Sequence, residues 1–89
     1  MSLNETNQSL EAFALSALGW TLQENGRAER LLALTGLTPD ALRSRLDDPQ
    51  VLSAVLRFLE GHEPDLIACA EALNVKPEEL VEARRRLEA

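Results

Sequence analysis

The sequence is poor in the residue types that build strands. It has no tyrosine, and Phe13, Phe58 and Trp20 are its only aromatic residues. β-Branched residues are also few, whereas Leu, Ala, Glu and Arg are abundant. Strands favour aromatic and β-branched side chains, while helices favour the abundant types. The composition therefore predicts an all-α fold.

Residue types for catalysis and metal binding are equally scarce, because His62 is the only histidine and Cys69 the only cysteine. One of each cannot supply the three or four ligands of a zinc site, and one cysteine cannot form an internal disulfide. A Cys69–His62 nucleophile pair would need both side chains on one helix, yet Pro64 begins a new helix between them. We expect no enzymatic activity, no cofactor and no metal, a buried Cys69, and a reducing, cytoplasmic location.

Targeting and membrane signals are also lacking. The first residues, MSLNETNQSL, contain no basic region followed by an apolar run, so we expect no signal peptide. No apolar run approaches the ~20 residues of a membrane span. The net charge of −6 opposes binding to phosphate backbones and anionic lipids, because both attract Lys and Arg. Acidity suits instead solubility, or a protein partner with a basic face.

Helix-start and helix-stop signals divide the chain. Thr38-Pro39 and Asp48-Pro49 each place a capping side chain before a proline, and prolines recur at Pro64 and Pro77. Gly36 and Asn74 suit the left-handed residue that ends a helix. We predict a flexible N-terminus over residues 1–7 and one helical domain over 8–89. The domain is a compact irregular or orthogonal bundle of five or six short helices, which start near residues 8, 27, 39, 49, 63 and 77.

Apolar periodicity then indicates how the helices pack. The segment 49–60 is the most apolar, so we place it at the centre. In the segment 63–74, Ile67 is assigned to the inward face with Leu66, Ala70 and Leu73. Gly19 lies within the first helix, where we interpret it as a point of close approach by another helix.

The first helix supplies a candidate interaction surface. Leu15 and Leu22 lie to one side of its main apolar stripe, and Trp20 lies off that stripe. Tryptophan is enriched at interfaces, although a core position for Trp20 is the commoner outcome, and we leave both open. The leading hypothesis is a non-catalytic protein-interaction module with an unidentified protein partner. A homodimer through the first helix is one form of it.

A second hypothesis comes from the last two helices. The segment from Ile67 to Leu80 has the rhythm of a helix-turn-helix, and Arg84, Arg85 and Arg86, further along its second helix, would be the nucleic-acid contacts. However, its second helix opens with Pro77, Glu78 and Glu79, and cations in a last turn also complement the helix dipole. Nucleic acid is therefore the alternative partner. This hypothesis would be strengthened only if further arginines formed one surface patch with these three.

The middle of the chain also carries a family resemblance. The residues that carry it are Leu34-Thr35-Gly36-Leu37, Pro39, Leu42-Arg43, Asp48-Pro49, Val55-Leu56, Phe58-Leu59, Glu63 and Pro77-Glu78, with Ala17-Leu18 and Trp20 upstream. In these positions the chain resembles the bacterial family called domain of unknown function 3572, over roughly residues 10–87. The resemblance implies a small, stand-alone, cytosolic helical protein. It implies no activity and assigns no catalytic residue.

Overall fold

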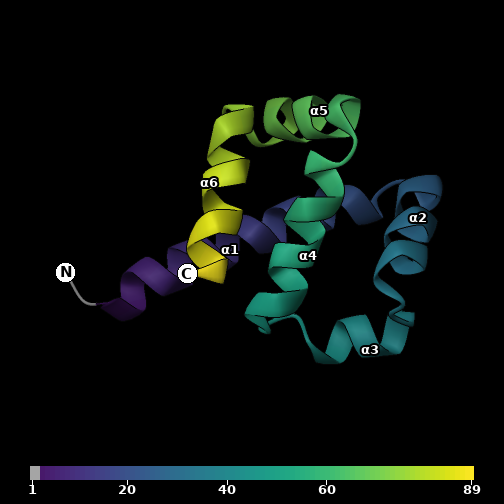
Figure 1. Ribbon diagram of the computed structural model, residues 1–89, viewed down its shortest axis with the longest axis horizontal. Helices are drawn as coiled ribbons and strands as arrows, with labels where there is room; N and C mark the ends of the chain where they lie inside the picture. The colour runs from purple at the N-terminus through teal and green to yellow at the C-terminus, as the bar shows by residue number, and fades with distance from the viewer. Residues whose placement is uncertain (1–2) are drawn as a thin grey trace.

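The computed structural model describes the backbone of residues 3–89 and the side chains of residues 9–89. These residues contain helices and no strand, as the composition predicts (Figure 1). The helices are α1 (Leu3–Leu22), α2 (Asn25–Thr35), α3 (Pro39–Ser44), α4 (Pro49–Glu60), α5 (Glu63–Leu73) and α6 (Pro77–Glu88). The prediction of an all-α fold with five or six short helices is confirmed.

The first helix starts earlier in the chain than predicted. α1 begins at Leu3 rather than near residue 8, and it ends at Leu22. Residues 1–2 and the side chains of residues 3–8 lie outside the described part of the chain, and most of the flexible N-terminus predicted over residues 1–7 lies there with them. That flexibility stays a prediction.

The predicted start and stop signals act where the sequence places them. The Thr38 hydroxyl accepts a hydrogen bond from the Ala41 amide at 3.1 Å, and the Asp48 carboxylate accepts one from the Gln50 amide at 2.9 Å. Each of these bonds satisfies an amide that has no partner within its helix. Gly36 ends α2 with a φ of 73°, and Asn74 ends α5 with a φ of 59°. Both are left-handed, as expected.

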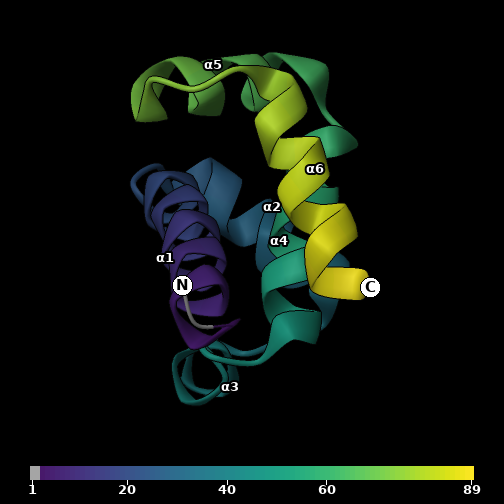
Figure 2. The same ribbon diagram turned by 90° about the vertical axis from the view of Figure 1, so that its left-hand side faces the viewer.

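α4 is the central helix, as its apolar content predicts. It packs against α1, α2, α5 and α6, and Figure 1 shows it in the middle of the molecule. Its inner face is fully buried, with Leu52, Val55, Leu56 and Leu59 no more than 1% exposed. Figure 2 shows α1 and α6 on opposite sides of the view, α5 across one end and α3 at the other end. α3 packs extensively against no other helix.

Two side-chain predictions are wrong. Ile67 is 40% exposed and points away from the core that Ala70 joins. Gly19 has nothing within 4 Å of where a Cβ would lie, so no helix approaches it closely. Both errors have one cause, since helical periodicity defines a face but does not say how much of it a neighbour covers.

Candidate interaction surface

The structure separates the three residues predicted as an interaction surface. Leu15 and Leu22 are 37% and 40% exposed, and their spacing of seven residues places them on one face of α1. Trp20 is half-buried and packs against the core. The guanidinium of Arg27 lies 3.7 Å from the centre of its ring. Trp20 is therefore not part of the Leu15–Leu22 face.

Arg27 closes the corner between α1 and α2 around this tryptophan. Its guanidinium donates to the Trp20 carbonyl oxygen at 2.7 Å and to the Glu24 carboxylate at 2.8 Å. The Arg27 side chain is only 12% exposed. Stacking and hydrogen bonding together hold the guanidinium in one position. One face of the Trp20 ring is thereby covered within its own chain, and the residue remains half-buried.

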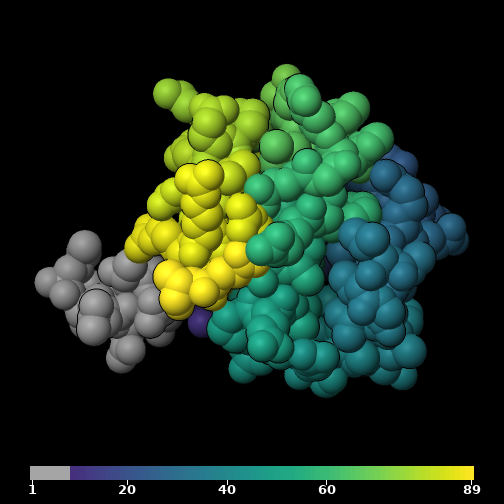
Figure 3. Space-filling model, in the orientation of Figure 1, coloured from purple at the N-terminus to yellow at the C-terminus, as the bar shows by residue number. Residues whose placement is uncertain are grey.

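A different apolar surface is open, between the last turn of α2, the residues that flank α3 and most of the length of α4. We call it the α2–α4 groove. It is a hollow of about 310 Å³ lined by Leu34, Thr35, Leu37, Arg45, Gln50, Val51, Ala54 and Arg57. Figure 1 shows α2, α3 and α4 framing this part of the molecule. In Figure 3, the blue atoms of α2 and the teal atoms of α3 and α4 form the same part of the surface. Leu34 is 70% exposed, more than the other large apolar side chains left at the described surface.

The polar lining of the α2–α4 groove includes two cations and no carboxylate. Arg45 is 44% exposed and donates to Asp48 at 2.8 Å, and Arg57 is 61% exposed and donates to Glu88 at 2.6 and 2.9 Å. Arg45 and the Gln50 amide, both donors to Asp48, lower the pKa of that carboxyl below its ordinary value. The groove thus combines an apolar floor with arginine edges on a protein whose net charge is −6.

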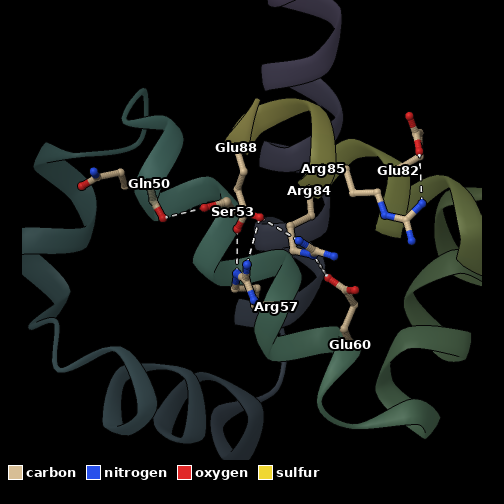
Figure 4. Close-up of polar contacts among 8 residues, drawn as sticks. All are labelled: Gln50, Ser53, Arg57, Glu60, Glu82, Arg84, Arg85 and Glu88. Atoms are coloured by element: carbon tan, nitrogen blue, oxygen red, sulfur yellow. Dashed lines mark hydrogen bonds and ion pairs between the residues drawn. The ribbon is translucent and has the colours of Figure 1, made fainter.

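The arginines of α6 do not form a free basic surface. Figure 4 shows Arg84 between Glu60 of α4 and Glu88 of its own helix, and it donates to both. Glu88 also accepts from Arg57 across the α4–α6 contact. Hydrogen bonds from Arg57 and Arg84 lower the pKa of Glu88, and the hydrogen bond to Glu60 raises the pKa of Arg84. These residues form an ion-pair network that connects α4 and α6 within the chain, and we call it the α4–α6 ion-pair network.

The other features of a nucleic-acid surface are also dispersed. Arg85 is exposed and lies 3.8 Å from Glu82, and Arg86 is exposed beside it. Arg43 of α3 and Arg45, which follows it, are remote from the arginines of α6, because α3 and α6 lie apart in both views (Figures 1 and 2). The first half of the exposed face of α6 carries Glu78, Glu79 and Glu82. The helix-turn-helix order of α5 and α6 is present, but its outward face opens with acids.

The two candidate catalytic residues have different surroundings. Cys69 is fully buried, as predicted, and this burial raises the pKa of its thiol to about 11, so the reactive thiolate is scarce at neutral pH. His62 lies half-exposed at the start of α5, with its Nε2 4.0 Å from an oxygen of Asp65. Among residues 9–89 no group of three or more His, Cys, Asp or Glu side chains is placed to hold a metal ion. Within the described helices, no stretch combines the length and the apolar character of a membrane span.

Sequence reasoning missed the α2–α4 groove, although one signal for it was present. Leu34 lies three residues after the buried Leu31, beside Thr35, at the last turn of α2. Leu31 is 1% exposed and Leu34 is 70% exposed, so only one of the two faces the core. An apolar side chain in the last turn of a helix stays exposed when the next helix is short and packs weakly against it.

These features define a class: a small all-α domain of short helices around one central helix, with an open apolar groove at one end. The chain belongs to the family described as protein of unknown function, DUF3572, whose model matches residues 7–89. The resemblance noted from the sequence is thus confirmed over nearly the whole chain. No curated protein and no solved structure matches it.

Proposed function

We propose that this protein is a non-catalytic protein-interaction module that binds a partner in the α2–α4 groove. The observation that carries the proposal is Leu34, a large apolar side chain that is 70% exposed at the edge of a hollow of about 310 Å³. Exposed apolar side chains around a concave site favour binding, because covering them removes apolar area from water.

The lining also suggests the chemistry of the partner. Arg45 and Arg57 line the groove, and Asp48 and Glu88, the carboxylates that accept from them, lie outside its lining. A segment with apolar side chains and flanking Asp or Glu would match both the floor and the edges. A short amphipathic helix presents such a pattern, with apolar side chains at i, i+3 and i+4. The partner class is therefore an acidic, amphipathic peptide segment.

The proposal extends to the cytoplasmic location expected from the single cysteine. It places nucleic-acid binding through α5 and α6 second, since Arg84 is engaged by Glu60 and Glu88. Burial of Cys69, which raises the pKa of its thiol to about 11, argues against this cysteine as a catalytic nucleophile.

The test is a selection that assumes no partner. A random peptide library is selected on the wild-type protein, and the enriched peptides are measured against Leu34→Asp and against Leu15→Asp as the matched control. We expect acidic peptides with helical apolar spacing, at least tenfold weaker binding to Leu34→Asp and unchanged binding to Leu15→Asp. Peptides that bind all three proteins equally, or a selection that enriches nothing, would overturn the proposal.

A further inference from the structure

The outer face of α5 carries a second exposed apolar surface. Pro64, Ile67 and Ala68 lie on it between Glu63 and Glu71, and these residues line one shallow depression. We call this surface the α5 face. Ile67 is 40% exposed. Glu63, Ile67 and Glu71 follow one another at a spacing of four residues, so they form one stripe along the helix.

The α5 face has the pattern of the partner that the α2–α4 groove calls for. The groove has an apolar floor with two lining arginines and no carboxylate, and the α5 face has an apolar centre with two lining glutamates and no cation. Both are of similar length, because Glu63 and Glu71 lie ~12 Å apart along α5 and Gln50 and Arg57 lie ~10 Å apart along α4.

We propose that a second copy of this chain occupies the groove and inserts its α5 face there. This inference rests on the proposed function of the groove and names one occupant for it. Ile67 of one copy would contact the surface around Leu34 of the next. Glu63 and Glu71 would approach the arginine edges.

The positions of the two surfaces determine the geometry of such an assembly. α5 lies at one end of the molecule and α3 at the other, in both views (Figures 1 and 2). The groove reaches the α3 end, since Leu37 and Arg45 flank α3, and it extends along α4 as far as Arg57. A copy therefore cannot fill its own groove. The contact joins two different surfaces, so copies can add head to tail, and two antiparallel copies that exchange both contacts would close as a symmetric pair.

The affinity of this contact is expected to be low. The two surfaces are lined by eight and five residues, fewer than the ~20–30 a side of a standard interface, so association should become visible only at high protein concentration. Because each copy offers both surfaces, head-to-tail addition would make the average mass keep rising with concentration, whereas a reciprocal pair would level off at a dimer.

The experiment uses light scattering and sedimentation of the wild-type protein and three exposed-site variants. Leu34→Asp should disable the groove and Ile67→Asp the α5 face, while Leu15→Asp is the control on α1. We expect Leu34→Asp and Ile67→Asp, each measured by itself, to be monomers at concentrations where the wild-type protein and Leu15→Asp associate. An equal mixture of the two monomeric variants should form a 1:1 dimer and stop there, because only one intact groove and one intact α5 face remain per pair.

Three outcomes would overturn the inference. One is a wild-type protein that stays monomeric throughout, and another is a mixture that forms no dimer. The third is association that only Leu15→Asp abolishes, which would favour the α1 homodimer. The peptide selection separates this failure from that of the proposed function: peptides weakened by Leu34→Asp would keep the groove as a binding site even if its occupant is another protein.

Discussion

The two sides of α4 are built differently. On one side, α6 lies against it, and the α4–α6 ion-pair network joins Arg57 and Glu60 to Glu88 and Arg84 above a layer of buried leucines. On the other side, α2 contacts α4 sparsely and α3 packs extensively against no helix, so the corner between α2 and α3 leaves Leu34 largely exposed. The first side is closed by its own chain, and the second is left open.

This difference shows that a helical fold can be fixed in two ways. The α4–α6 side is fixed mainly by burial, because Leu56, Leu59 and Leu80 are completely covered. The α2–α3 corner buries less and depends on turn chemistry, in the form of left-handed Gly36 and the Thr38 and Asp48 caps. A corner held by its caps can keep its shape while its apolar surface remains free for a partner.

The largest expected effect contrasts one leucine from each side. Leu56→Ala should lower the free energy of unfolding by about 2–5 kcal/mol, because it leaves a cavity at a fully buried position. Leu34→Ala should change it by no more than about 0.5 kcal/mol. Urea unfolding of both variants measures the difference. Equal losses would show that the corner is packed as tightly as the core, so that the two sides of α4 would not differ in packing.

A glycine pair tests the role of turn chemistry. Gly36→Ala should destabilise by about 1–2 kcal/mol, because an L-residue at a φ of 73° is strained. Gly19→Ala should instead stabilise by about 0.5–1 kcal/mol, since it is helical and has free space around its Cβ position. Thermal unfolding measures whether each variant is more or less stable than the wild-type protein. A neutral Gly36→Ala would mean that the backbone of the corner can relax at little cost.

Acid titration gives the smallest expected effect. Arg57 and Arg84 hold the pKa of Glu88 below its ordinary value of 4.5 in the folded state. Glu88 therefore stabilises the fold above pH 4.5, and this contribution is lost as the pH falls through the lowered folded pKa. Asp48 of the corner acts in the same direction below its ordinary value of 3.8.

The matched variants for this titration are Glu88→Gln and Arg57→Ala, compared with Arg86→Ala on the same helix. In the first two variants, the free energy of unfolding should fall less steeply as the pH is lowered below about 4.5. In Arg86→Ala, this dependence on pH should be the same as in the wild-type protein. A slope that none of the three variants alters would assign acid sensitivity to carboxylates outside the α4–α6 network.

Most of the fold, but little of the candidate site, could be read from the sequence. The capping residues and Gly36 act locally, so their effect on helix starts and ends was predictable from neighbouring residues alone. The inner face of α4 was predictable because its apolar residues repeat at helical spacing. The exposure of Trp20 and Ile67 was not predictable from the sequence. The exposure of Trp20 depends on Arg27, which stacks on its ring, and that of Ile67 depends on the outer side of α5, which none of the described helices covers.

The sequence by itself determined that the chain is helical, where most helices begin and end, and that α4 lies at the centre. Those properties follow from interactions between residues a few positions apart and from the amount of apolar surface on each helix. Only the tertiary structure decided that Leu34 and Ile67 stay exposed, that Arg84 is engaged by Glu60, and that the α2–α4 groove exists. Each of these depends on which helices meet across the fold, and helices distant in sequence leave no local pattern that records how closely they approach.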